Sequence, residues 1–236
     1  MALPFFYIES FDASQQLITL NEETSKHVVQ VLRMQVGEQL NLTDGKGSLL
    51  TAAISDAHKK HCVVQVKTVS YKPQAARKTT IAVSLVKNAS RFEWFLEKAT
   101  EIGVTEIIPL LCERTERQHF RFDRMKGILV SAMLQSQQTW LPVLHEPTKF
   151  ENLKMMQFEN ALKLIAHCDE TERTPFSNFQ INQFQNSIIL IGPEGDFTTT
   201  EINTAIAEGY KPVMLGETRL RTETAAVVAA TLLCIT

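Results

Sequence analysis

Apolar and polar positions alternate along residues 1 to about 70, with the period of a half-buried β-strand. Short apolar segments begin near residues 5, 17, 40, 49 and 63, and Asp44-Gly45-Lys46-Gly47 between two of them is a hairpin signal. One helix, expected from Glu22 to Met34, interrupts the strands. Short strands with a single helix predict a small β-barrel. The expected inner side of the helix is Val28, Val29, Val31 and Leu32.

From Thr80 the pattern changes to apolar strands that alternate with amphipathic helices. Strands are expected at 81–86, 106–111 and 161–166, and helices at 91–102 and 123–138. Ser90 with Glu93 is expected to cap the first of these helices. The segment 72–79 is polar, contains a proline and carries three positive charges, as a linker does. The pattern therefore predicts a β-domain at 1–71, a linker at 72–79 and an α/β domain at 80–236.

The stretch 188–226 organises the second domain. Its first four residues are apolar, as in a strand buried on both faces, and they stop at Gly192-Pro193-Glu194-Gly195. A capping box, Thr198 with Glu201, and a terminal glycine, Gly209, bound the helix that follows. A second strand at 212–215 leads to a polar loop at 217–223 and then to an apolar helix from residue 224. The expected apolar face of the first helix is Ile202, Ala205 and Ile206.

The strand ends of this domain are the expected ligand site. In open α/β sheets ligands bind in the crevice outside the carboxyl ends of the strands. A tight turn alone would account equally well for Gly192-Pro193-Glu194-Gly195. The second loop has more hydrogen-bonding groups than a connector needs. A third strand should end there as well, at His167. The hydrogen-bonding residues that crowd the end of this loop and the start of the helix are Arg219, Arg221, Thr222, Glu223 and Thr224.

Composition excludes several classes of protein. A hydrophobic content of 44%, a charged content of 21% and a net charge of −2 describe an ordinary globular protein without a strongly basic surface. The four cysteines lie far apart with no CxxC pair, so we expect free thiols and no metal site. The chain start lacks a secretory pattern, and its longest apolar run is too short for a membrane span. A cytoplasmic protein is expected.

One segment is nevertheless basic. Five cations lie within the thirteen residues from Arg114 to Lys126, interleaved with acidic residues. A nucleic-acid contact and a mixed-charge exposed loop explain this segment equally well from charge alone. In the first domain Lys26 and Arg33 are candidates for phosphate contacts. The candidates in the basic segment are Arg114, Arg117 and Arg121.

Six motifs together resemble one family. The pair formed by IGPEGDF at 191–197 and LGETRLRTETA at 215–225 resembles the signature of the knotted (SPOUT) RNA methyltransferases, specifically the small-subunit ribosomal RNA uridine-N3 methyltransferases. HVVQVLRM at 27–34, DGKG at 44–47, EKATEIGV at 97–104, and QS with LP at 135–142 match further segments. The resemblance implies a PUA-like β-barrel, a knotted parallel-sheet domain and a homodimer. It also implies methylation of uridine N3 in small-subunit (16S) ribosomal RNA, with S-adenosyl-L-methionine as cofactor.

The resemblance also implies which residues act. Removing the imide proton of uridine N3 calls for a base, and a nearby cation would stabilise the resulting anion. Arg221 is the first candidate for that cation, with Glu223 and Glu194 as bases or orienting groups, although each glutamate could equally be a helix cap. The cofactor pocket would be lined by His167, Gly192, Pro193, Glu194, Gly195, Leu215, Gly216, Leu220, Arg221, Thr222, Thr224 and Ala225.

Three places depart from the family pattern, and other functions stay open. Asp196 stands where a second glycine is usual, Gln138 where an arginine is usual, and Thr218-Arg219 where an arginine and an apolar residue are common. A related knotted methyltransferase that acts on another base or on tRNA is the nearest alternative. A non-catalytic ribosome-assembly protein that binds RNA is the alternative from another class. A dinucleotide oxidoreductase is disfavoured, because no GxGxxG follows a strand.

Overall fold

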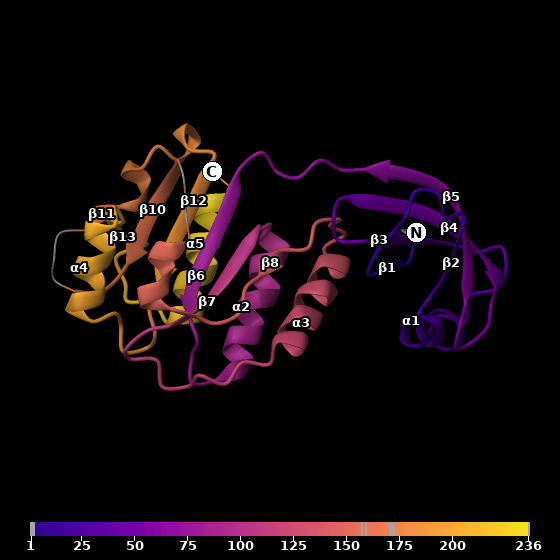
Figure 1. Cartoon of the computed structure of the whole chain (residues 1–236), viewed down its shortest axis with the longest axis horizontal. Coiled ribbons are helices and arrows are strands. Elements are labelled where there is room, and N and C mark those ends of the chain that lie inside the picture. The colour runs from indigo at the N-terminus through magenta and orange to yellow at the C-terminus, as the bar shows by residue number, and fades with distance from the viewer. Residues whose placement is uncertain (1–2, 157, 159, 170–172, 236) are drawn as a thin grey trace. The chain divides into compact units, whose positions relative to one another are not determined.

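A computed structural model describes residues 3–156, 158, 160–169 and 173–235 (Figure 1). The chain forms two compact units. The first consists of Met1–Gln74 with Met133–Leu141, and the second of Ala75–Ala132 with Pro142–Thr236. Within the described residues no helix is long and apolar enough to cross a membrane.

The first unit is built on a five-stranded sheet in the order β1-β3-β4-β5-β2. β1 pairs with β3 in parallel, and the other pairs are antiparallel. Alternate residues such as Leu40, Leu42 and Leu50 are fully buried in its core, as the period of two predicted. The strands are β1 Phe5–Tyr7, β2 Leu17–Thr19, β3 Gln39–Thr43, β4 Ser48–Asp56 and β5 Val63–Tyr71.

The helical segment of this unit differs from the prediction. It consists of α1 Glu22–Lys26 followed by a π-helix, η1 His27–Val31. Val28 is fully buried, but Val31 is 66% and Leu32 42% exposed, so the predicted inner side is wrong for these two. The cause is the winding, because Leu32 N–H donates to the His27 carbonyl five residues back, at 2.9 Å. A π turn shifts the face that a spacing of 3.6 residues assigns.

The second unit is built on an eight-stranded sheet, with the order β11-β13-β10-β12-β6-β7-β8 and with β9 also paired to β7. Every pairing among its described strands is parallel. The strands are β6 Lys78–Ser84, β7 Glu106–Leu111, β8 Val143–Leu144, β9 Thr148–Lys149, β10 Ala161–Ala166, β11 Thr174–Pro175, β12 Asn186–Ile191 and β13 Lys211–Met214. The predicted α/β class is confirmed.

Helices cover both faces of this sheet. Ile188 and Leu190 of β12 pack with Ile202 and Ala205 of α4 in one core cluster. Successive strand residues point to opposite faces, so Ile189 faces the other side, where α5 packs on β6 and β12 and also against α2. The helices are α2 Ala89–Ile102, α3 Phe122–Gln135, α4 Thr199–Ala207 and α5 Thr222–Ile235, with the 3-10 helices η2 Phe150–Met155, η3 Phe176–Asn178 and η4 Ile181–Gln183.

Local signals predict the ends of α4 better than those of α2. The capping box of Thr198 and Glu201 is formed, and Gly209 just beyond α4 has a φ of 86°. Ile206, however, is 42% exposed and does not belong to the buried face. For α2 the predicted capping box is wrong. Asn88 is the N-cap and accepts from the Ser90 N–H, while the carboxylate of Glu93 binds both Nε and Nη2 of Arg124.

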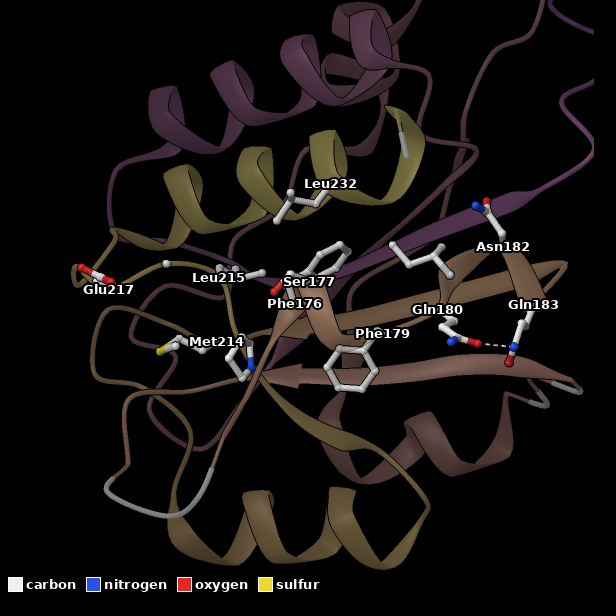
Figure 2. A pocket seen from close by; sticks show the side chains of 13 residues that line it. Phe176, Ser177, Phe179, Gln180, Asn182, Gln183, Met214, Leu215, Glu217 and Leu232 are labelled. Carbon is white, nitrogen blue, oxygen red and sulfur yellow. Dashed lines mark hydrogen bonds between the residues drawn. The ribbon is translucent and has the colours of Figure 1, made fainter.

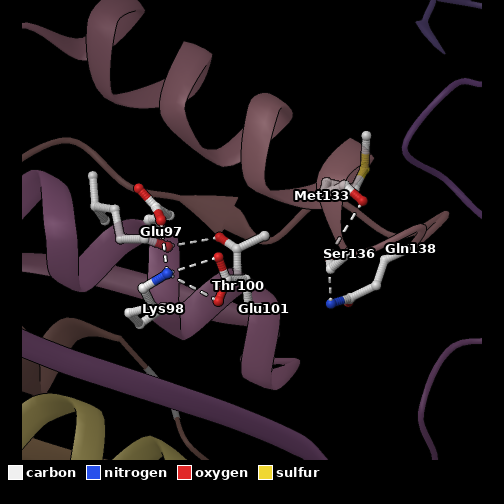
Figure 3. A network of polar contacts seen from close by, with 8 residues as sticks. Glu97, Lys98, Thr100, Glu101, Met133, Ser136 and Gln138 are labelled. Carbon is white, nitrogen blue, oxygen red and sulfur yellow. Dashed lines mark hydrogen bonds and ion pairs between the residues drawn. The ribbon is translucent and has the colours of Figure 1, made fainter. Parts of the chain in front are cut away.

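Figure 3 shows two polar clusters on helices α2 and α3. Lys98 on α2 donates to the carboxylates of Glu97 and Glu101, at 2.7 and 3.0 Å. At the end of α3, the amide of Gln138 donates to Ser136 Oγ, at 3.0 Å, and Ser136 donates to the Met133 carbonyl. Gln138, which stands where the family pattern has an arginine, therefore folds back on the end of its own helix.

Candidate functional site

The register of three parallel strands brings their carboxyl ends to one level. Ala166 of β10 lies opposite Ile191 of β12 on one side and opposite Val213 of β13 on the other. The residues that follow these strands line a cavity of about 650 Å³. Of the residues predicted to bind the cofactor, the lining contains His167, Gly192, Pro193, Glu194, Leu215, Gly216, Leu220, Arg221, Thr222 and Ala225.

The lining differs from the prediction in both directions. Of the residues predicted to bind the cofactor, Gly195 and Thr224 are not part of it, and neither is the catalytic candidate Glu223. Arg173 also lines the cavity, which the sequence did not predict, because this residue lies in a polar segment that was expected to be an irregular surface connection. Asp196 was visible only as a departure from the family pattern. The additional lining residues are Ala166, Cys168, Arg173, Ile191, Asp196, Val213, Met214, Glu217, Thr218 and Arg219.

The loop after β12 is folded tightly on itself. The Asp196 N–H donates to the Pro193 carbonyl at 2.9 Å and closes a turn. A Cβ at Gly192 would lie 3.1 Å from both the backbone nitrogen and the ring of Phe197, so this approach favours glycine. Thr222 Oγ1, at the start of α5, donates to the Gly192 carbonyl at 3.0 Å. These contacts join the loop after β12 to the first turn of α5.

Asp196 links two of the strand ends. Its φ of 65° lies in the left-handed region, which is why a glycine is common at such a position. Its carboxylate accepts from the Cys168 N–H at 2.7 Å, just beyond β10, and from the Phe197 N–H at 2.8 Å. A short carboxylate side chain that bonds locally is one of the few that tolerate this backbone. The departure from the family pattern thus adds a tie between the ends of β10 and β12.

His167 is the most unusual residue of the cavity. It is only 4% exposed, yet neither ring nitrogen has a hydrogen-bond partner among the residues that the structure describes. Burial lowers the pKa of its imidazole, and Arg173 adds to the shift, whereas the carboxylates of Asp196 and Asp169 oppose it. A buried polar group without a partner is costly. A ligand that offers a donor or an acceptor to this ring would remove that cost, so the cavity fits a polar small molecule.

The three candidate catalytic residues have different surroundings. Arg221 is exposed and lines the cavity. Glu223 is 7% exposed, and its carboxylate lies 3.6 Å from Nε of Arg91. Glu194 also lines the cavity, and its carboxylate accepts from the Lys87 backbone N–H at 3.0 Å. Both glutamates therefore have partners that hold them in place, and Glu194 and Arg221 are the two candidates that line the cavity from exposed positions.

The basic segment is bound to the strand ends. Arg114 Nη1 donates to the carbonyls of Gly195 and Phe197, at 2.7 and 3.3 Å, and Arg117 Nη1 donates to the Lys87 carbonyl at 3.2 Å. Arg121 is exposed.

The two candidates of the first unit are also exposed. Lys26 Nζ forms an ion pair with Glu22 at 2.8 Å. Arg33 has a φ of 55°, an uncommon conformation for a residue with a side chain. The sequence predicted neither the ion pair of Lys26 nor the left-handed backbone of Arg33.

A second cavity, of about 700 Å³, lies beside the first and shares Met214, Leu215, Gly216 and Glu217 with it. Figure 2 shows Phe176, Phe179 and Leu232 around it, together with Gln180 and Gln183, which bond to each other. The segment 175–183 that forms one wall was expected to be an irregular surface connection. Two short 3-10 helices instead bury Phe176 and Ile181.

Comparison with known proteins identifies the family. A model of an RNA methyltransferase domain matches residues 73–234, and one of an RNA methyltransferase PUA domain matches residues 20–67. A ribosomal RNA small subunit methyltransferase E from Synechocystis sp. is 32% identical over 217 residues, which cover 90% of this chain and 71% of that protein. The chain belongs to this RNA methyltransferase family.

Solved structures agree with the assignment to the methyltransferase family. A probable rRNA methyltransferase from Porphyromonas gingivalis is 38% identical, with a TM-score of 0.89 over 99% of both chains. A putative methyltransferase from Legionella pneumophila, in complex with S-adenosyl methionine, is 30% identical, with a TM-score of 0.88 over 99% of this chain and 97% of its own. The predicted family, fold class and PUA-like domain are thereby confirmed, and the cofactor expected from the sequence is the one bound in that neighbour.

We predict that Gly192→Ala destabilises the methyltransferase fold by about 1–3 kcal/mol, because the added methyl group would push against the backbone and ring of Phe197. Gly216→Ala is the matched control, since a Cβ there meets no described atom within 4 Å. Urea unfolding of both variants measures the difference. Equal midpoints for the two variants would contradict the packing described for the Gly192 loop.

We further predict that the free energy of unfolding falls as the pH drops below 6.5, the ordinary pKa of histidine. The pKa of the His167 imidazole is lower in the folded state, so the unfolded chain binds more protons in this range and protonation favours unfolding. His167→Gln should reduce the slope of stability against pH from about pH 7 to about pH 5. Urea unfolding at several pH values measures the slope, and an unchanged slope in the variant would exclude this linkage.

Proposed function

We propose that this protein transfers the methyl group of S-adenosyl-L-methionine to N3 of a uridine in small-subunit ribosomal RNA. The observation that carries the proposal is the cavity at the ends of β10, β12 and β13. Its wall contains the buried His167, whose ring nitrogens have no hydrogen-bond partner among the described residues. Membership of the family supports the reaction class. A relative from Neisseria gonorrhoeae, 26% identical with a TM-score of 0.86 over 97% of this chain and 95% of its own, was solved as a ribosomal RNA small subunit methyltransferase E bound to S-adenosyl methionine.

Main-chain groups and small side chains would hold the cofactor. Gly216, where a Cβ would meet no described atom within 4 Å, leaves room for a ligand beside the backbone, and His167 offers its ring nitrogens as hydrogen-bond partners. When bound, the cofactor supplies a methyl group already activated by a sulfonium. The task of the protein is therefore positioning, which can supply a large part of the rate enhancement. The proposed set is His167, Gly192, Pro193, Glu194, Gly195, Leu215, Gly216, Leu220, Arg221, Thr222, Thr224 and Ala225.

Arg221 is proposed to stabilise the negative charge that develops on the uridine when its N3 proton leaves. A fixed guanidinium near the base would act as an electrostatic catalyst. Glu194 lines the same cavity and is the better placed of the two candidate bases. Glu223 is buried beside Arg91, which suits a residue that orients its neighbours.

The proposed RNA contacts lie in both units. Within the basic segment, Glu116 pairs with Lys87 at 2.8 Å, so one of the acids that would offset the segment's cations is itself neutralised. The proposal assigns RNA contacts to Lys26, Arg33, Arg114, Arg117 and Arg121. It also includes the boundaries 1–71, 72–79 and 80–236, a knotted second domain, a homodimer, and action in the cytoplasm.

The test is the ribosomal RNA of cells that lack this protein. Mass spectrometry should show the loss of one methylated uridine from small-subunit RNA, and the purified protein should restore it from labelled cofactor. Offering free RNA and assembled subunits separately identifies the substrate form. If the missing methyl group belongs to another base or to tRNA, the protein is a related methyltransferase with that substrate and not a uridine-N3 methyltransferase. Normal methylation together with no cofactor binding would favour a non-catalytic RNA-binding protein.

We predict that Arg221→Ala lowers kcat by about a hundredfold or more, because a lost charge stabiliser acts on the transition state. Since Arg221 is exposed, the free energy of unfolding should stay within about 0.5 kcal/mol of that of the parent protein. Single-turnover methylation with saturating cofactor and RNA measures the effect. Turnover equal to that of the parent protein would remove Arg221 from the mechanism.

A further inference from the structure

Arg114 forms two hydrogen bonds to the loop at 192–197, which follows β12 and is called the cofactor loop below. Its Nη1 lies 2.7 Å from the Gly195 carbonyl and 3.3 Å from the Phe197 carbonyl. These carbonyls flank Asp196, the residue in the left-handed conformation. The side-chain stem also runs over the loop, since a Cβ at Gly195 would lie 3.4 Å from Cδ of Arg114. The guanidinium of Arg114 therefore binds the carbonyls on either side of Asp196, whose backbone is in the left-handed conformation.

The base of this arginine is itself held in place. The Thr115 N–H donates to the Cys112 carbonyl at 3.0 Å, which makes a turn with Arg114 at its tip. Thr115 is 6% exposed, and its hydroxyl bonds to the Cys112 N–H at 2.9 Å and to Ser84 Oγ at 2.8 Å. The neighbouring Glu113 N–H donates to the Glu201 carboxylate at 2.9 Å. Because this turn is anchored to β6 and to α4, the guanidinium is held ready before any ligand arrives.

The cofactor loop needs such support at its exposed point. Phe197 is 2% exposed and anchors one end of the loop in the core, and Gly192 follows directly from a buried strand. Between them Glu194 and Gly195 are exposed. A left-handed residue with a side chain persists only where the surrounding contacts hold it. Arg114 supplies two of those contacts from a different strand end.

We infer that Arg114 is a positioning residue that holds the 192–197 loop in the shape of the cofactor cavity. This inference rests on the proposed function and extends it, because it gives Arg114, a cation of the basic segment, a role in cofactor binding. The charge-assisted bonds to the Gly195 and Phe197 carbonyls orient the main chain that would bind S-adenosyl methionine. A contact with RNA alone predicts no effect of Arg114 on cofactor affinity when RNA is absent.

Calorimetry with S-adenosyl methionine and no RNA tests the inference. Arg114→Ala should weaken cofactor affinity by about tenfold, as expected for the loss of charge-assisted hydrogen bonds. Arg114→Lys should recover part of the loss, because its ammonium can still reach a carbonyl. Lys126→Ala is the charge-matched control, since it removes one cation from an exposed position of α3 and should leave the affinity unchanged. Arg114→Ala with parent-like cofactor affinity and weaker RNA binding would overturn the inference.

Two further readouts separate positioning from general damage. In turnover at saturating RNA, Arg114→Ala should raise KM for the cofactor, and Lys126→Ala should not. Without any ligand, hydrogen exchange of the 193–198 segment should become faster in Arg114→Ala and not in Lys126→Ala. If the parent protein binds no cofactor, the proposed function fails, and the exchange experiment still decides the role of Arg114. Unchanged exchange in Arg114→Ala would refute that role.

Discussion

The parallel pairing of β10 with both β12 and β13 is the constraint on which the site depends. Because Ala166 faces Ile191 on one side and Val213 on the other, three loops leave the sheet at the same level. Each loop alone is a short polar connection without a ligand site. The register, stabilised by fully buried side chains such as Ile165 and Leu190, turns them into the wall of one cavity.

Polar contacts then give the loops a single shape. Asp196 joins the end of β10 to the loop after β12, Thr222 joins the same loop to α5, and Arg114 joins it to the end of β7. Nearly all buried polar groups in proteins have such partners. His167 does not have one among the described residues, and this is the reason why the cofactor is proposed to bind beside it.

The charge pattern explains how an acidic protein can act on RNA. The net charge is −2, so affinity for phosphate has to come from a local surface. The basic segment is the surface proposed here, and two of its arginines are bonded to the main chain of strand ends. A cation that binds backbone carbonyls in this way has a fixed orientation without any ligand.

The sequence by itself determined the features that depend on neighbouring residues. The strand before Gly192, the capping box of α4 and the left-handed glycine that ends it follow from local spacing, and the motifs were sufficient to indicate the family. Only the tertiary structure decided the winding that exposes Val31, the replacement of the predicted cap of α2 by Asn88, the second cavity, and the carbonyl partners of Arg114. Hydrophobic periodicity reports which face of an element is buried, whereas these features depend on groups distant in the sequence or on hydrogen bonds that a regular period does not encode.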